Sequence, residues 1–329
     1  MLWIHIGMPK TGTTALQGYL HSNAAFLQDH NIRYMTAGRD RGTGRARLIC
    51  QNSMAVAMSR GWTDAPTPQA FAQEYDRHAT QHCIVSSEMF FGRDLSPLYE
   101  RYLATLATPV RFVVYLRRFD DFLEADYKQR AKNGMRTRGV DAFVANRLAQ
   151  IAGDPDYMNF SLMFERIAQQ VPGAEIIPRL YLREEMAGHD VISDFLSLMD
   201  VPTSDVVLPK VGSNQSLSRM ASEALGRFNG GGPDFDKKAR RQLGRALQNT
   251  ADPRIFRRGD VLNAAERTQI NDALEARNAA MRETYFPGRD QLFPPREDTF
   301  MAFQRGGSEE LADFQYINDK LNKLVQKQD

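Results

Sequence analysis

The chain has 329 residues, of which 42% are hydrophobic and 25% are charged, so it can bury a full core and is not disordered as a whole. Lys and Arg total 42 against 40 Asp and Glu, and this net charge of +2 argues against a globally basic nucleic-acid binder. Two cysteines, Cys50 and Cys83, lie outside any C-x-x-C spacing and offer neither a disulfide framework nor a metal site.

The hydropathy of the chain predicts no membrane span, because no apolar run approaches about 20 residues. The first residues enter a strand-like run without the charged and apolar regions of a signal peptide. We therefore expect a cytoplasmic protein that recognises charged ligands locally.

The N-terminal stretch has the pattern of a strand, a tight turn and a helix. Residues 3–6 are strand-like, and apolar residues recur at helical spacing over 16–27. Between them, Gly7, four residues, Gly12 and a terminal hydroxyl at Thr14 match the frame of a phosphate-binding loop. In such a loop, backbone N–H groups at a helix N-terminus surround an anion.

One position departs from the nucleoside-triphosphate version of this loop. There a lysine precedes the last hydroxyl residue, whereas this chain has Thr13 and carries its lysine at Lys10. A lysine on the near side of the anion suits a nucleotide with a short 5′ chain better than one with magnesium and a third phosphate. The alternative is an ordinary strand-to-helix turn that uses Gly and Thr for capping.

Strands and helices alternate along the chain to about residue 215. The predicted strands are 32–35, 82–87, 110–116 and 175–182, and the predicted helices are 51–60, 68–79, 119–130 and 191–199. This alternation indicates an α/β protein, a three-layer sandwich with a mainly parallel sheet.

The later part of the chain is predicted to be helical. Ser216 or Ser218 is expected to cap a helix over 219–228. Apolar residues recur every three or four positions over 311–324 for barely two heptads, which predicts an amphipathic helix docked on its own domain rather than a coiled coil. We expect one domain over 1–300 with helical additions and a C-terminal amphipathic segment over 301–329.

Two loops are expected to vary with the substrate. Residues 38–47 hold three glycines and four arginines, which predicts a basic loop that is either solvated or in contact with an acidic ligand. The other is the segment 130–140. Loops of this kind vary freely within one fold, so they leave the acceptor substrate open.

Charged residues follow three of the predicted strands directly. Lys10 follows the first strand, Glu88 the strand at 82–87, and Arg117 the strand at 110–116. Ligands of open parallel sheets bind beyond the carboxyl ends of the strands, so these three side chains are expected to converge on one crevice. Two cations and a carboxylate suit group transfer from a doubly anionic nucleotide.

The loop also carries a family resemblance. The hexapeptide after the first strand resembles the 5′-phosphosulfate loop of the sulfotransferases that use 3′-phosphoadenosine-5′-phosphosulfate (PAPS); it consists of Pro9, Lys10, Thr11, Gly12, Thr13 and Thr14. The resemblance extends over about residues 1–215. It implies a nucleotide-kinase-like P-loop fold, PAPS as sulfuryl donor, 3′-phosphoadenosine-5′-phosphate as product and no required metal. The absence of the N-terminal anchor of Golgi members implies a bacterial or cytosolic type.

A second segment resembles the signature by which this family holds the 3′-phosphate. That signature is an Arg followed eight residues later by a Ser; here Arg117 matches, but the later position is Ala125. The lost hydroxyl removes one hydrogen bond to an anion, worth ~1.5–3 kcal/mol if nothing replaces it. Candidates to replace it are Arg118, Lys128, Arg130 and Lys132.

The expected general base is Glu88, because it follows a strand end and some carbohydrate sulfotransferases use a glutamate near this place. The alternative is that Glu88 is a buried structural partner of an arginine. His21 is eight residues past Thr13, about 12 Å along a helix, and is too far from the loop. His5 is expected to be a satisfied core residue.

The sequence thus predicts a sulfotransferase that modifies a hydroxyl or amine of a carbohydrate or small metabolite, without a nucleic-acid partner. One alternative is a nucleotide or small-molecule kinase, which would need a lysine in place of Thr13 and an acidic magnesium ligand. The other is a non-catalytic nucleotide-binding protein, which Ala125 makes conceivable.

Overall fold

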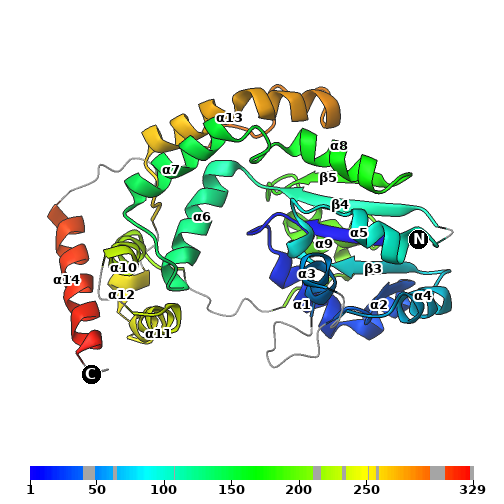
Figure 1. Ribbon diagram of the computed structural model, residues 1–329, viewed down its shortest axis with the longest axis horizontal. Coiled ribbons are helices and arrows are strands. Elements are labelled where there is room, and N and C mark those ends of the chain that lie inside the picture. Colours follow the sequence, from blue (N-terminus) through cyan, green and yellow to red (C-terminus); the bar gives the residue numbers. More distant parts are fainter. Residues whose placement is uncertain are drawn as a thin grey trace. The chain divides into compact units, whose positions relative to one another are not determined.

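A computed structural model describes residues 1–39, 49–61, 65–106, 108–209, 216–231, 235–250, 252–256, 259–296 and 308–326. The chain groups into two compact units (Figure 1). The first consists of Met1–Arg118 and Phe160–Lys210, and the second of Phe119–Asn159 and Val211–Asp329. The predicted domain over 1–300 is thus divided between the two units. The sequence did not indicate the division, because the alternation of strands and helices continues through 119–159 without a linker-like change in composition.

The first unit is built on one five-stranded sheet in which all neighbouring strands are parallel. The strands are β1 (Leu2–Gly7), β2 (Ile32–Tyr34), β3 (His82–Ser86), β4 (Val110–Leu116) and β5 (Glu175–Leu180). They lie in the order β2-β3-β1-β4-β5, so the central strand is β1, which leads into the predicted phosphate-binding loop over residues 7–14, called the phosphate-type loop below (Figure 1). This confirms the predicted α/β class and parallel sheet.

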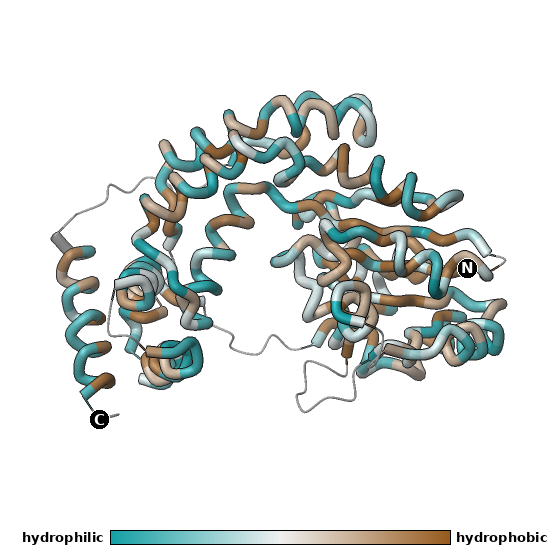
Figure 2. Tube along the Cα trace, in the orientation of Figure 1, coloured by the Kyte–Doolittle hydropathy of each residue, from teal (hydrophilic) through white to brown (hydrophobic). Residues whose placement is uncertain are grey.

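One face of the sheet packs on a cluster of buried apolar side chains. Trp3, Val113 and Tyr115 project from the strands, and the helices α1 (Thr13–Ser22) and α9 (Val191–Ser197) cover them. Figure 2 shows long hydrophobic stretches along the sheet strands, as expected of strands that are buried on both faces.

The strand residues of opposite parity are buried as well. Leu2, Ile4 and Ile6 of β1 are at most 1% exposed. The helices outside the first cluster supply the further core residues Met54, Phe71 and Phe164; they are α3 (Asn52–Arg60), α4 (Pro68–Arg77) and α8 (Phe160–Gln170). Helices with a sheet between them are consistent with a three-layer α/β sandwich.

Shorter elements complete the first unit. They are α2 (Ala24–Asp29), η2 (Glu88–Phe90), α5 (Ser96–Leu98), η3 (Tyr99–Leu103), η4 (Ala187–His189) and η5 (Thr203–Asp205). The predicted helix over 16–27 is divided into α1 and α2 at Asn23, whose side chain donates to the Tyr19 carbonyl at 2.9 Å. The predicted strands and the helices of this unit are confirmed to within a few residues, whereas most of the predicted basic loop lies outside the described residues.

The described part of the second unit consists of helices and their connections. They are α6 (Phe119–Lys132), α7 (Val140–Gly153), α10 (Arg219–Gly231), α11 (Lys237–Gln248), α12 (Pro253–Phe256), α13 (Ala264–Tyr285) and α14 (Ser308–Val325). Ser218 accepts from the Ala221 N–H at 3.2 Å, which confirms it as a cap of α10. Ile317 and Leu321 of α14 are fully buried against α10 and α11, so the amphipathic helix docks within its own chain as predicted.

A buried arginine ties the start of α6 to α13. Arg267 is 2% exposed, and its guanidinium donates to Asp120 at 2.9 Å and to Glu124 at 3.1 Å. Asp121 and Asp260 each accept from it at 3.1 Å. Burial lowers the pKa of Arg267, but the surrounding carboxylates outweigh this effect and hold the pKa above its usual value.

None of the described helices is both long enough and apolar enough to cross a bilayer.

Candidate functional site

The loop between β1 and α1 follows a path that few residue types permit. Lys10 and Gly12 both have φ of +75°, in the left-handed region. A side chain at position 12 would also place its Cβ 2.8 Å from Val191 Cγ1. Gly12 is therefore required both by the backbone angle and by the approach of α9, whereas Lys10 holds a conformation that costs a non-glycine residue free energy.

The loop presents the N-terminal end of α1. The Ala15 and Leu16 N–H groups donate to the Gly12 carbonyl at 2.9 and 3.1 Å and close the first helical turn. The Thr11 hydroxyl donates to the Met8 carbonyl at 2.7 Å and fixes the loop from within. The amides that precede the first closed turn lie at the positive end of the helix dipole, which favours an anion.

The residues of the loop differ in their exposure to solvent. Thr11 and Thr13 are buried, Pro9, Lys10 and Gly12 are partly exposed, and Thr14 is exposed. The Thr13 hydroxyl has no hydrogen-bond partner among the described residues. Its position beside Gly7, where a Cβ would lie 2.3 Å from Thr13 Oγ1, explains the glycine that ends β1.

Arg117 contacts the loop directly. Its Nη1 donates to the Lys10 carbonyl at 2.7 Å, and its backbone N–H donates to Met8 Sδ at 3.4 Å. The guanidinium carbon also lies 5.8 Å from the centre of the Tyr181 ring, within the range of a cation–π contact. The structure therefore brings together two of the three predicted residues, Lys10 and Arg117.

These two residues lie where the chain leaves neighbouring strands toward opposite edges of the sheet. β1 pairs with β4 through Gly7 and Tyr115, so both strands end at the same edge. After β1 the chain proceeds to β2 at one side of the sheet, and after β4 it proceeds to β5 at the other. Such a reversal point is where open parallel sheets bind ligands.

Glu88 lies two residues beyond the end of β3 and is exposed. Because β3 pairs with β1 through Ser86 and His5, it ends at the same sheet edge as β1. The Ser87 N–H donates to the His5 carbonyl at 3.2 Å, and the Ser87 hydroxyl donates to Asn52 at 2.6 Å. The exposure of Glu88 excludes the alternative of a buried arginine partner.

A buried polar group lies beneath the loop. His5 Nδ1 is 2.8 Å from Ser86 Oγ, which also accepts from Gln17 Nε2 at 3.1 Å. Complete burial lowers the pKa of His5 to about 3, so the ring is neutral near pH 7. His5 was predicted to be a satisfied core residue; it is buried, but its Nε2 has no partner among the described residues.

The second-signature position Ala125 lies on α6 in the second unit, whereas Arg117 belongs to the first. Two of the proposed replacements for the missing hydroxyl are engaged within the second unit. Lys128 Nζ lies 2.8 Å from Glu124 and 2.9 Å from the Gly259 carbonyl, and Arg130 Nε lies 2.6 Å from Asp126. These contacts favour structural roles for both cations.

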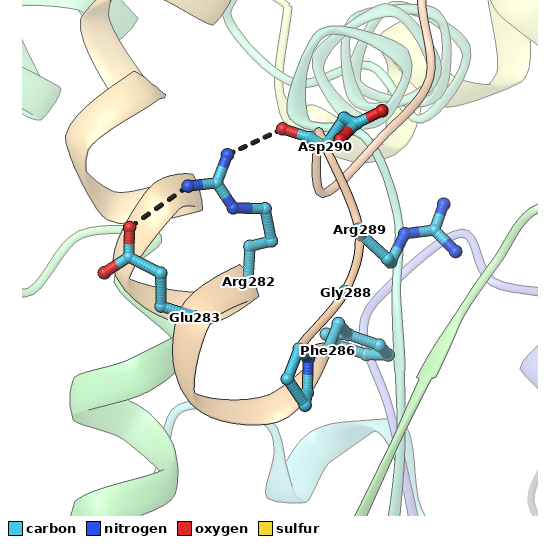
Figure 3. Close-up of a pocket in the computed structure, with 7 residues that line it drawn as sticks. Arg282, Glu283, Phe286, Gly288, Arg289 and Asp290 are labelled. Atoms are coloured by element: carbon cyan, nitrogen blue, oxygen red, sulfur yellow. Dashed lines mark hydrogen bonds and ion pairs between the residues drawn. The ribbon is translucent and has the colours of Figure 1, made fainter.

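A separate hollow of about 440 Å³ lies at the C-terminal end of α13 in the second unit. Arg282 donates to the Asp290 carbonyl at 2.7 Å and to Glu283 at 3.1 Å. Figure 3 shows both contacts, and Arg289 pointing away from them. Arg289 in turn donates to the Gln291 carbonyl at 3.3 Å, so both arginines of the hollow make contacts within the chain, and no predicted site residue lines it. In the described part of the chain, no three His, Cys, Asp or Glu side chains form a group that could hold a metal ion.

Part of the chain is similar to a protein of another organism. A protein of Archaeoglobus fulgidus, described as uncharacterized, is 29% identical over 148 residues. The match covers 44% of this chain and 38% of that relative, so the chain spans well under two thirds of the relative's length. No family model and no solved structure matches the chain.

Proposed function

We propose that the protein is a sulfotransferase that moves a sulfuryl group from PAPS to a hydroxyl or amine of a carbohydrate or small metabolite. The observation that carries the proposal is the pairing of a left-handed, lysine-bearing loop with Arg117 at the reversal point of a parallel sheet. The central position of β1 supports the nucleotide-kinase-like P-loop fold that the sequence resemblance implies.

The residues around the loop fit an anionic nucleotide with a short 5′ chain. The amides of Gly12, Thr13 and Thr14 would hold its 5′ oxygens, since Gly12 is the N-cap of α1 and the two threonines begin its first turn. The buried Thr13 hydroxyl, which no described group satisfies, fits a loop that is completed by a ligand. Arg117 would hold the 3′-phosphate from the neighbouring strand end.

When bound, PAPS supplies the sulfuryl group, whose bond to the 5′-phosphate oxygen breaks as the acceptor oxygen or nitrogen bonds to sulfur. Lys10 and the loop amides stabilise the negative charge that develops on the leaving phosphate. Glu88, exposed at the same sheet edge, takes the proton that the attacking hydroxyl or amine of the acceptor substrate loses. Its exposure suits contact with an acceptor that arrives from solvent.

A nucleotide or small-molecule kinase is the rival proposal from the same fold. The buried position of Thr13 argues against it, since that hydroxyl lies beside Gly7 instead of reaching outward as a lysine there would. A nucleotide-binding protein without catalysis would keep the loop and need no base at Glu88.

Titration calorimetry with 3′-phosphoadenosine-5′-phosphate, PAPS and ATP separates the three proposals. We expect the bisphosphate and PAPS to bind without magnesium and ATP to bind much more weakly. Strong binding of ATP with magnesium and none of the bisphosphate would favour the kinase. A binder that transfers no sulfuryl group to any acceptor in a panel of sugars, amines and phenols would favour the non-catalytic protein.

A further inference from the structure

Two buried polar side chains lie beside Gly7, at the start of the loop between β1 and α1. His5 and Thr13 are 0% and 3% exposed, and neither His5 Nε2 nor Thr13 Oγ1 has a partner among the described residues. A Cβ at Gly7 would lie 2.3 Å from Thr13 Oγ1 and 3.2 Å from His5 Cε1, the ring carbon between Nδ1 and Nε2. The missing side chain of Gly7 therefore leaves the His5 ring and the Thr13 hydroxyl as neighbours.

The contacts of Ser86 bear on which ring nitrogen of His5 carries the proton. Gln17 Nε2 donates to Ser86 Oγ, which keeps its own hydrogen for another contact. His5 Nδ1 lies 2.8 Å from the same oxygen. With the Ser86 hydrogen directed at Nδ1, the neutral imidazole carries its proton on Nε2. In that arrangement the unpartnered ring atom is a donor, and the unpartnered hydroxyl oxygen of Thr13 can accept from it.

The strand end that carries Ser86 is itself held firmly. Gln51 accepts from the Ser86 N–H at 2.8 Å, and the Gln51 N–H donates to the Ser86 carbonyl at 2.9 Å. The Gln51 side chain also donates to the Met35 carbonyl at 2.7 Å. These contacts hold the backbone of Ser86, so its hydroxyl is presented to His5 Nδ1 by a fixed strand end.

We propose that His5 is a positioning residue of the phosphate-type loop: its Nε2–H donates to the Thr13 hydroxyl when an anion occupies the loop. The contact fixes the side chain of Thr13 and, through it, the direction of the Thr13 amide at the first position of α1. Leaving two buried polar atoms unsatisfied is unfavourable, so joining them in the bound state strengthens anion binding. The inference rests on the proposed anion site but not on sulfuryl transfer.

Two amide substitutions separate the ring nitrogens of His5. An Asn side chain reaches the place of Nδ1 and not that of Nε2, whereas a Gln side chain reaches the place of Nε2. We expect His5→Asn to weaken binding of 3′-phosphoadenosine-5′-phosphate and of inorganic pyrophosphate by ~10-fold, which corresponds to one hydrogen bond. We expect His5→Gln to keep both affinities within ~3-fold of the original protein.

The decisive measurement is a double-mutant cycle with Thr13→Val, which removes the acceptor and keeps the shape. In the Thr13→Val protein, His5→Asn should change neither affinity further. Additive losses, or equal losses in the Asn and Gln variants, would overturn the positioning role. If His5→Asn does not fold, Ser86→Ala replaces it in the cycle, because it removes the group that selects the tautomer.

Nitrogen-15 NMR of the His5 ring tests the tautomer without a ligand: a protonated Nε2 is expected, and a protonated Nδ1 would overturn the inference. Pyrophosphate binding with the expected coupling, but no binding of the bisphosphate, would support His5 while overturning the proposed function. Binding of both probes without coupling would do the reverse. Failure of both probes to bind would overturn both proposals.

Discussion

The guanidinium of Arg117 donates to the backbone carbonyl of Lys10 at 2.7 Å, so the residue predicted to hold the 3′-phosphate also holds the loop predicted to hold the 5′ group. One side chain thus serves two parts of the proposed nucleotide site. Removing this side chain should weaken the binding of both the 3′ and the 5′ groups of a nucleotide, but not equally.

Arg117→Ala should weaken 3′-phosphoadenosine-5′-phosphate by ~10- to 100-fold, since a charge-assisted hydrogen bond contributes ~1.5–3 kcal/mol. The binding of adenosine 5′-phosphate should weaken less, because this nucleotide has no 3′-phosphate and loses only the support that Arg117 gives to the loop. Calorimetry measures both affinities, and Arg111→Ala, at the opposite end of β4, is the matched control. Equal weakening of the two nucleotides would leave Arg117 with the loop-holding role alone.

Lys10→Gly and Lys10→Ala should separate the charge of Lys10 from its backbone angle. Both variants remove the ammonium group and should lower turnover more than ligand affinity. Only glycine relieves the φ of +75°, so the Gly variant should be more stable than the Ala variant by ~0.5–1 kcal/mol. Urea unfolding and steady-state kinetics check the two parts. A parallel loss of affinity and turnover would make Lys10 a binding residue only.

Glu88→Gln should lower turnover by ~10² or more while leaving stability nearly unchanged, because the side chain is exposed and its amide cannot accept the acceptor proton. Glu100→Gln, exposed within η3, should change neither quantity and is the matched control. Turnover and melting midpoint are measured for both variants. Full turnover in Glu88→Gln would assign the base to another residue.

The free energy of unfolding should decrease as the pH falls below 6.5, the pKa of a free histidine, because burial lowers the pKa of His5 from 6.5 to about 3. The unfolded chain takes up a proton below pH 6.5 that the folded chain refuses until about pH 3, so the stabilisation present above pH 6.5 is lost on acidification. Between pH 7.5 and 5.5 His5 should account for ~1.4 kcal/mol of unfolding free energy. Urea unfolding at both pH values should show a smaller decrease in His5→Gln.

Arg267→Met should destabilise the second unit by ~3–5 kcal/mol, since it leaves four carboxylates around a buried position without their shared cation. Arg282→Met, on the same helix, removes a cation whose carboxylate partner is exposed and should cost less than ~1 kcal/mol. Urea unfolding followed by circular dichroism compares the two. Equal effects would show that the burial of Arg267 is not what makes its contacts strong.

Much of the first unit could be predicted because its signals are local. β4 is a run of β-branched and aromatic residues, and the glycines and threonines around Lys10 define a strand, turn and helix. Tyr181 was not predicted as a site residue. It matters through its contact with Arg117, which lies 64 residues earlier in the chain, and no local sequence pattern indicates such a contact. Ser86 and Gln17 were missed for the same reason, since their polarity has meaning only beside His5.

The division of the chain into two units was also beyond the sequence. Arg267 has its partners near residues 120 and 260, and neither segment differs in composition from an ordinary helix or loop. The exposure of Glu88 could not be foreseen either, because a glutamate after a strand is compatible with burial or solvent. Strand ends predicted which residues share an edge, but not which of them touch.

The central position of β1 has a consequence for how the protein is made. This strand is synthesised before both of its neighbours, β3 and β4, which end at Ser86 and Leu116. At ~5–20 residues per second, β1 waits seconds for the strands that pair with it. A nascent chain halted before residue 110 would leave the apolar strand β1 without its partner β4, so we expect ribosome-bound chains of that length to be chaperone clients and longer ones to be released from that dependence.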